Sequence, residues 1–368
     1  MKITSVTPYI CDCYRTNWIF VRVETDDGLY GWGEATLEHR EPTTAEAVRE
    51  IGRSVIGRRA ADIEAIWQDV NREVYYRGGP VFMSALGGVE MALWDIKGKA
   101  LGVPVYELLG GRVRDRIPCY ANAWFAGSTR PEEFAARAGD AVASGYKGLK
   151  WDPFGAAYLE LTPTEFRTAE ACVAAVAGAV DGQAELLIEG HGRFDVPSAV
   201  RIADMLAAYR VGWFEEPLPP GNLEALADVR RRSRVPIAAG ERLYSRWEYL
   251  PFFAAQCADY AQPDITHVGG LAELRRISDF AEAHYIPCCP HNPCGPVANA
   301  ATLTCTKAWV WACCARTWAS SAATARASRR SARPACARAC IQVWRCAKAT
   351  SSSPSCWSSC WCRRKRTY

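Results

Sequence analysis

The chain has 368 residues, of which 49% are hydrophobic and 23% are charged, with a formal net charge of +4. This composition is that of a folded protein with one large or two medium domains, and it excludes a disordered chain, a collagen-like repeat and a small disulfide scaffold. No apolar run approaches the roughly 20 residues that cross a bilayer, and the N-terminus alternates like a strand where a signal peptide needs an apolar helix. We therefore expect a cytoplasmic protein with no membrane partner.

The first predicted elements form a small antiparallel sheet within residues 1–30. Alternating residues from Phe20 to Glu24 lead into Asp26-Asp27-Gly28, a hairpin turn signal. A helix is predicted to start at Thr43, and apolar residues recur with helical spacing from Ile63 to Val70 and from Ala85 to Leu101. Together these elements predict an α+β domain over residues 1–115.

From Ile117 onward, short apolar runs alternate with amphipathic helices, which is typical of parallel β/α units. A doubly wound sheet also produces this alternation, but seven units after a separate domain fit a (β/α) barrel that needs one more strand. We assign the barrel to residues 116–303. The strand candidates are Cys119–Ala121, Gly148–Trp151, Glu185–Glu189, Val211–Glu215, Pro236–Glu241, Tyr260–Asp264 and Tyr285–Pro290.

The composition changes abruptly at residues 303–304. From Thr304 to Tyr368 there are 13 Lys and Arg residues but no Asp or Glu, so the remaining 303 residues hold 31 basic and 40 acidic side chains. Nine of the 17 cysteines and six of the 14 tryptophans also lie in this segment, which lacks Gly, His, Leu, Met, Asn and Phe. Such a segment offers neither a leucine core nor the start and stop signals of ordinary helices.

We interpret residues 304–368 as the product of a coding frame change in a GC-rich gene. A basic tail that binds nucleic acid normally brings Lys, Gly or Ser without this density of Cys and Trp, and a disulfide-bonded tail conflicts with a cytoplasmic location. We therefore expect no nucleic-acid partner. The eighth barrel strand would fall in this anomalous tail, and we expect it to be disrupted.

Polar residues end successive strand candidates at nearly regular intervals. Glu189, Glu215, Glu241, Asp264 and His291 are separated by 26, 26, 23 and 27 residues. In a barrel these positions meet at the carboxyl-terminal face, where catalytic groups gather. Three carboxylates that converge there repel one another, and a hard divalent cation is the natural compensation, with oxygen-only ligation favouring Mg²⁺ over zinc or copper. Any single Glu of this kind is more often a solvated rim residue.

At these same residues the sequence resembles the mandelate racemase group of the enolase superfamily, and within it the sugar-acid dehydratases of the galactonate dehydratase type. The resemblance runs from about Met1 to Thr302. It implies an enolase-like α/β fold, with an N-terminal α+β capping domain and a (β/α) barrel of modified TIM type. The motifs that carry it are Gly31-Trp32-Gly33-Glu34, Ala92-Leu93-Trp94-Asp95-Ile96-Lys97-Gly98-Lys99, Trp213-Phe214-Glu215-Glu216-Pro217, Ala239-Gly240-Glu241 and Gln262-Pro263-Asp264.

The resemblance implies a Mg²⁺-dependent dehydration of an aldonate or aldarate to a 2-keto-3-deoxy acid. In that family the substrate carboxylate binds Mg²⁺, the α-proton is removed, and the metal holds the enediolate before the β-hydroxyl departs. A proton next to a carboxylate is too weakly acidic for a neutral base unaided, so a divalent ion must lower much of the barrier. By resemblance Glu189, Glu215 and Glu241 are the metal ligands, with Glu189 replacing the commoner Asp.

The resemblance also assigns two histidines. Asp264 and His291 match the family's strand-end dyad, in which a carboxylate orients an imidazole that acts as general base. His191, two residues after Glu189, corresponds to the acid that assists hydroxide departure in similar dehydratases. The alternatives are a His291 that caps the loop before Pro293 and a His191 that is a structural residue near the metal. The remaining histidines, His39, His267 and His284, are assigned no role.

Lys150 and Asp152 occupy the end of the second strand candidate, where racemases of the group carry a Lys-x-Lys pair. A racemase needs a base on each face of the α-carbon, so a carboxylate in the second position argues against two-sided proton exchange. We expect Lys150 to neutralise charge on the substrate carboxylate and Asp152 to contact a substrate hydroxyl or balance charge. A surface ion pair between Lys150 and Asp152 is the alternative.

The resemblance also indicates which segments select the substrate, and it shows one position at which this sequence differs from the family pattern. Arg15, Asn17, Trp18, His39 and Arg40 lie where family members carry their substrate loops, and they suit a hydroxylated acid better than an apolar one. Family members also carry a glutamate on the eighth strand that binds the substrate carboxylate. Here, twenty residues after His291, the sequence has Trp311.

We therefore predict a sugar-acid dehydratase, a hydro-lyase whose partner is a small-molecule sugar acid and which forms a homo-oligomer. The alternatives are a racemase, epimerase or cycloisomerase of the same superfamily, which conserves the mass of its substrate, and a non-catalytic homologue, which keeps the fold without the activity.

Overall fold

A computed structural model describes residues 1–13, 16–72 and 75–308. Arg15, Trp311 and the tail from residue 309 onward lie outside the described residues. The elements are β1 (Ile3–Cys11), β2 (Trp18–Thr25), β3 (Tyr30–Glu34), α1 (Glu41–Val55), α2 (Ile63–Arg72), α3 (Pro80–Leu101), α4 (Val105–Leu108), α5 (Pro131–Ala143), β4 (Gly148–Trp151), α6 (Pro163–Val180), β5 (Glu185–Glu189), α7 (Val196–Ala207), β6 (Trp213–Glu215), α8 (Leu223–Arg232), β7 (Ile237–Ala239), α9 (Arg246–Ala254), β8 (Tyr260–Ala261), α10 (Leu271–Ala283) and α11 (Pro296–Lys307).

The N-terminal sheet is antiparallel, with its strands in the order β1-β2-β3. The predicted hairpin joins β2 to β3, and Gly28 there adopts a φ of 84°, which glycine tolerates without strain. The third strand, β3, was not predicted, because its sequence Tyr-Gly-Trp-Gly-Glu contains two glycines that weaken the strand pattern. Helix α1 begins at Glu41, two residues before the predicted start.

The two glycines of β3 allow helix α3 to lie directly against the sheet. A Cβ atom on Gly31 would lie 2.0 Å from the carbonyl oxygen of Ala92, and one on Gly33 would lie 1.8 Å from that of Gly88. No larger residue fits at either position, so the Gly-Trp-Gly-Glu motif is a packing requirement of this domain.

The second sheet is parallel, with its strands in the order β4-β5-β6-β7-β8. Single bridges extend it at both ends, from Ala121 to Leu149 and from Ala261 to Cys288. The first and seventh strand candidates, Cys119–Ala121 and Tyr285–Pro290, therefore lie at the two edges of the sheet where they were predicted, but each forms a single bridge and not a full strand. Proline explains this difference, because Pro118, Pro287 and Pro290 flank the bridges and have no N–H to donate to a ladder.

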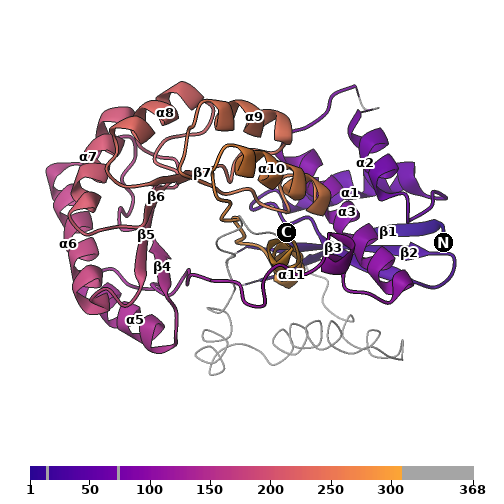
Figure 1. Ribbon diagram of the computed structural model, residues 1–368, viewed down its shortest axis with the longest axis horizontal. Helices are drawn as coiled ribbons and strands as arrows, with labels where there is room; N and C mark the ends of the chain where they lie inside the picture. Colours follow the sequence, from indigo (N-terminus) through magenta and orange to yellow (C-terminus); the bar gives the residue numbers. More distant parts are fainter. Residues whose placement is uncertain (14–15, 73–74, 309–368) are drawn as a thin grey trace, which may run out of the picture. The chain divides into compact units, whose positions relative to one another are not determined.

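Alternation along the parallel strands separates two layers of side chains. Ile188 and Phe214 belong to the large core that includes the surrounding helices, while Leu187 and Trp213 belong to a separate inner cluster. Figure 1 shows α5, α6, α7 and α8 on the outer side of the arc formed by β4 to β7. Since residues two apart in a strand share a face, the final residues of β5 and β6 lie on the same side as the inner cluster.

Two buried glutamates of the N-terminal region cap helices of the C-terminal region. Glu34 accepts hydrogen bonds from the backbone N–H groups of Gly295, Val297 and Ala298, at 2.5, 3.1 and 2.9 Å, at the start of α11. Glu90 accepts from Leu271 at 2.8 Å and from Ala272 at 2.9 Å, at the start of α10. Neither α10 nor α11 has a side-chain cap of its own, so these carboxylates satisfy amide groups that otherwise lack partners.

The helices bear on the prediction that the protein has no membrane-spanning segment. Within residues 1–13, 16–72 and 75–308, no helix is both long enough and apolar enough to cross a bilayer. The longest of these helices, α3, has 22 residues and contains Glu90, Asp95, Lys97 and Lys99. A cytoplasmic location stays a prediction.

We predict that Glu90→Ala lowers the free energy of unfolding by about 2–4 kcal/mol, because it leaves two buried amide groups and the indole N–H of Trp94 without their acceptor. Urea denaturation followed by circular dichroism measures the change. The matched control is Glu46→Ala on α1, where the carboxylate makes only exposed ion pairs, with Arg49 and Arg53, and a loss within about 0.5 kcal/mol is expected. Equal losses in the two variants would contradict the capping role.

Candidate active site

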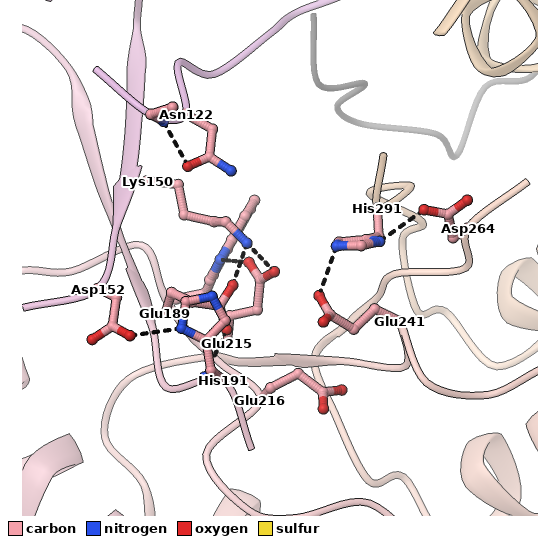
Figure 2. A network of polar contacts seen from close by, with 12 residues as sticks. Asn122, Lys150, Asp152, Glu189, His191, Glu215, Glu216, Glu241, Asp264 and His291 are labelled. Carbon is pink, nitrogen blue, oxygen red and sulfur yellow. Dashed lines mark hydrogen bonds and ion pairs between the residues drawn. The ribbon is translucent and has the colours of Figure 1, made fainter. Parts of the chain in front are cut away.

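Three glutamates converge at the carboxyl ends of neighbouring parallel strands. Glu189 and Glu215 are the last residues of β5 and β6 and lie opposite each other in the strand register, and Glu241 follows β7 by two residues. One carboxylate oxygen from each lies within 4.8 Å of the others. Figure 2 shows their side chains directed toward a common region. The regular spacing in the sequence therefore corresponds to a single carboxylate cluster.

Lys150 of β4 lies against this cluster, with its ammonium group in contact with carboxylate oxygens of both Glu189 and Glu215. The lysine is only 1% exposed, so the alternative of a surface pair with Asp152 is wrong. Burial alone would raise the pKa of Glu189, but Lys150, His191 and a hydrogen bond with Glu215 together outweigh it and hold this pKa below its ordinary value. The Lys150 ammonium group therefore compensates part of the charge of the cluster.

The cluster has the donor set of a site for a hard divalent cation. Its ligand atoms are all carboxylate oxygens, which Mg²⁺ and Ca²⁺ prefer over the sulfur and nitrogen ligands of zinc sites. One lysine charge leaves an excess of negative charge among three carboxylates that are almost completely buried, and buried like charges are costly unless a counter-ion offsets them. The residues present thus fit a divalent metal.

His291 joins the cluster to a buried aspartate. Its Nδ1 lies 2.8 Å from Oδ2 of Asp264, and its Nε2 lies 3.0 Å from Oε2 of Glu241. Burial alone would raise the pKa of Asp264, but the neighbouring His267 and the hydrogen bonds from His291 and Thr266 together outweigh it and hold this pKa well below its ordinary range. The hydrogen bond between Nδ1 and the ionised carboxylate of Asp264 fixes the orientation of the His291 ring. Nε2 therefore faces the carboxylate cluster (Figure 2).

A second imidazole lies beside the other end of the cluster. The backbone N–H of His191 donates to Glu189 at 2.9 Å, and its Nδ1 lies 2.6 Å from Oδ2 of Asp152. Burial alone would lower the pKa of His191, but the hydrogen bond to Asp152 and the charge of Glu189 outweigh it, so this pKa is raised. Asp152 is thus the partner of His191 and not of Lys150.

Two arginines that hold this arrangement, Arg193 and Arg242, were not predicted from the sequence. Arg193 donates to both oxygens of Asp152, at 2.9 and 2.7 Å. Arg242 donates to the backbone carbonyl of His191 at 2.8 Å and lies between Glu216 and Glu241, 3.8 Å from each. Only the closeness of Arg193 to His191 and of Arg242 to Glu241 in the chain was a signal, and arginines are too common on surfaces for that signal to be specific.

Glu216 is a further buried carboxylate next to the cluster. Burial, followed by the negative charge of Glu241, raises its pKa to about 8. Its Oε1 accepts a hydrogen bond from the backbone N–H of Gly240 at 2.9 Å. The group is therefore a structural acceptor between β6 and β7, and the cluster proper keeps three carboxylates.

Of the residues predicted to select the substrate, the structure describes Asn17, Trp18, His39 and Arg40. Trp18 is buried and lies beside Gly295, where an added Cβ would come 2.8 Å from its ring. No hydrogen bond or ion pair within residues 1–13, 16–72 and 75–308 joins Asn17, His39 or Arg40 to the carboxylate cluster. Their part in substrate selection stays a prediction.

We predict that Lys150→Met lowers the free energy of unfolding by about 3–5 kcal/mol in the absence of divalent cations, because the change leaves two buried carboxylates without their counter-charge. The control is Lys147→Met, an exposed lysine just before β4, with an expected change within about 0.5 kcal/mol. Chemical denaturation in a chelating buffer provides the measurement. A Lys150→Met variant as stable as the control would show that the lysine does not compensate the cluster.

The chain is similar to known families over most of its length. Residues 10–110 match the mandelate racemase/muconate lactonizing enzyme N-terminal domain, and residues 133–341 match the enolase C-terminal domain-like family. Two solved structures share its fold. A member of the enolase superfamily from Salmonella Typhimurium has a TM-score of 0.83 at 31% identity, over 86% of this chain and 87% of that one. A mandelate racemase/muconate lactonizing enzyme-like protein from Rubrobacter xylanophilus has a TM-score of 0.79 at 34% identity, over 86% of each chain.

Curated relatives are more similar still. The chain is 40% identical over 303 residues to a D-galactonate dehydratase from Variovorax paradoxus, covering 82% of this chain and 78% of the relative. It is 39% identical over 303 residues to a D-galactonate dehydratase from Pectobacterium atrosepticum, with the same coverage. These similarities agree with the enolase-like architecture expected from the motifs, with an N-terminal capping domain and a C-terminal α/β barrel domain.

Proposed function

The chain belongs to the mandelate racemase/muconate lactonizing enzyme family, and we propose that it is a hydro-lyase that dehydrates a sugar acid to a 2-keto-3-deoxy acid. The observation that carries the proposal is the pair of differently held imidazoles, His291 with Asp264 and His191 with Asp152, beside one carboxylate cluster. Loss of water requires a base at the α-carbon and an acid at the β-hydroxyl, and the two imidazoles supply both.

We assign His291 as the general base. Asp264 accepts at Nδ1, which leaves Nε2 to take the proton from the α-carbon of the substrate. Because the negative charge of Asp264 stabilises the imidazolium that forms, the aspartate orients the ring and increases its basicity. The fit of this geometry to proton abstraction supports the role of the dyad.

We assign His191 as the general acid. Its hydrogen bond to Asp152 favours the protonated ring, and Asp152 is itself held by Arg193, so the ring is oriented before the substrate arrives. When the bond from the β-carbon to its hydroxyl oxygen breaks, the oxygen leaves with the electron pair and a proton from His191, as water. The resulting enol then becomes the 2-keto acid.

We assign Glu189, Glu215 and Glu241 as ligands of Mg²⁺, in keeping with their oxygen-only donor set. When bound, Mg²⁺ would withdraw electron density from the substrate carboxylate and make the α-proton more acidic. Lys150, which lies against the same carboxylates, supplies a second positive charge for the substrate carboxylate.

The contacts of Asp152 favour dehydration over racemisation. A racemase needs a second base on the opposite face of the α-carbon, but the oxygens of Asp152 accept from Arg193, the backbone N–H of Phe154 and the ring of His191. A carboxylate with these partners positions an acid and is poorly suited to remove a carbon-bound proton. The proposal therefore predicts loss of water and not exchange of configuration.

We predict that His291→Asn lowers the rate of 2-keto acid formation by roughly 10²–10⁴-fold, because the general base is lost. The assay supplies the full chain with Mg²⁺ and a panel of aldonic and aldaric acids, and it detects the 2-keto product. The matched control is His284→Asn, a histidine at the C-terminus of α10 that stacks on Phe253, which we expect to keep the wild-type rate. Products with the mass of the substrate would favour an epimerase instead.

We further predict that Mg²⁺ raises the melting temperature of the wild type, because a ligand that binds only the folded state stabilises it by about 2.7 kcal/mol at 100 times its Kd. Glu215→Gln should abolish this shift, while Glu224→Gln, an exposed glutamate of α8, should preserve it. Differential scanning calorimetry with and without Mg²⁺ makes the comparison. A shift of equal size in both variants would exclude the carboxylate cluster as the metal site.

A further inference from the structure

His267 is a buried histidine with no role in the proposed reaction. It is 8% exposed, and neither of its ring nitrogens has a hydrogen-bond partner within residues 1–13, 16–72 and 75–308. Its backbone N–H donates to the carbonyl oxygen of Asp264 at 3.0 Å, so the turn after β8 fixes its position. A buried polar group without a partner costs about 1–3 kcal/mol, and such a group in a folded protein indicates a missing water, ion or ligand.

Two further groups with metal-binding chemistry lie next to this ring. A nitrogen of His267, a carboxylate oxygen of Asp264 and the sulfur of Cys294 all lie within 4.8 Å of one another, and all three residues are buried. Imidazole, carboxylate and thiolate are the three ligand types of protein zinc sites. Tetrahedral zinc places its ligand atoms about 3.5 Å apart, so a side-chain movement of about 1 Å would bring these three atoms to that spacing and leave the fourth position for a water molecule.

The other polar contacts of these residues come mainly from Thr266. Oδ1 of Asp264 accepts from the backbone N–H and the hydroxyl of Thr266, at 2.8 and 2.6 Å. The sulfur of Cys294 lies 3.4 Å from the hydroxyl of Thr266 and 3.8 Å from the carbonyl oxygen of Thr36, and a thiol is only a weak hydrogen-bonding group that a metal can displace. The carboxylate of Asp264 beside this thiol attracts a divalent cation, and the cation displaces the thiol proton to solvent when it binds.

We propose that Asp264, His267 and Cys294 form a second cation site, suited to Zn²⁺ and distinct from the carboxylate cluster. The two sites differ in chemistry, because sulfur and nitrogen donors select zinc whereas three carboxylates select Mg²⁺. In Figure 2, Asp264 lies on the side of His291 opposite Glu241, so the second site is behind the imidazole and not between it and the carboxylates.

Sharing Asp264 gives the second site a consequence for catalysis, which rests on the proposed function. Zinc draws the carboxylate away from Nδ1 of His291, 2.8 Å from it in this structure, and weakens the bond that orients the base. Zinc therefore inhibits the dehydration while Mg²⁺ occupies the carboxylate cluster.

Imidazole nitrogen resonances test the site directly. The chain has five histidines, and none of them lies after residue 303. Zinc bound by the cysteines of the tail therefore has no histidine ligand from the tail, and it does not produce the signal that is measured. The full chain is labelled with ¹⁵N-histidine, saturated with Mg²⁺, kept reduced and titrated with Zn²⁺. The resonances of His267 are identified by their absence in His267→Gln. We expect them to shift to the metal-bound pattern in the wild type and in Cys172→Ser, a buried cysteine of α6, but not in Cys294→Ser.

Zinc binding to the unlabelled proteins gives a second measurement, which applies even where Cys294→Ser does not fold. In equilibrium dialysis, His267→Gln should hold one fewer tight zinc than the wild type, with an affinity at that site lowered at least ~10-fold. His267 resonances that do not respond to Zn²⁺, or equal zinc content in wild type and His267→Gln, would overturn the second site.

A kinetic measurement tests the consequence for catalysis. At the same zinc concentration, the Mg²⁺-dependent reaction of the wild type should be inhibited, whereas the rate of His267→Gln should equal its rate without zinc. Equal inhibition of both proteins would overturn the link to His291. Absence of any dehydratase activity would instead count against the proposed function, and the imidazole resonances would still decide the second site.

Discussion

The arrangement of this protein around its candidate site depends on negative charge held at the carboxyl ends of parallel strands. Glu189, Glu215 and Glu241 bring carboxylate oxygens within 4.8 Å of one another in an environment with little water. Such a cluster is stable only with positive charge beside it; Lys150 supplies part of that charge, and the proposed divalent cation would supply the rest. The charge that makes the cluster costly in the folded chain also makes it suited to binding a metal and a substrate carboxylate.

Contacts from the N-terminal region bear on the same site. Glu34 caps the helix that follows His291, and Glu90 caps the helix that follows Asp264 and His267. Burial raises the pKa of both carboxyls to about 7, and the helix amide groups that they accept from oppose this rise. The segments that carry Asp264 and His291 are therefore anchored by residues distant in the sequence, which couples the folding of the capping domain to the geometry of the proposed base.

The sequence was most informative where the fold repeats. The regular spacing of Glu189, Glu215 and Glu241 reflects β/α units of similar length, so the meeting of these carboxylates could be predicted without coordinates. The motif glycines Gly31 and Gly33 were recognised as a family feature, but their reason, contact with α3, appears only in three dimensions.

The remaining contacts depend on side-chain directions that spacing does not determine. Lys150 and Asp152 are two residues apart, yet Lys150 lies against the glutamates while Asp152 binds His191 and Arg193. His267 gave no signal in the sequence, because its importance lies in unpartnered nitrogens beside Asp264 and Cys294. Contacts of this kind depend on how loops after the strands turn, and several different turns satisfy the same hydrophobic pattern.

The most direct test of the account follows the hydrogen on the α-carbon of the substrate. The full chain is given Mg²⁺ and a sugar acid deuterated at that carbon, and product mass and turnover are compared with those of the unlabelled acid. The account predicts a 2-keto-3-deoxy acid that has lost one water, has no deuterium at the former α-carbon and forms more slowly from the labelled acid. If the reaction instead gave an epimer of the sugar acid that had lost no water, and no keto acid, this result would contradict the proposed dehydration.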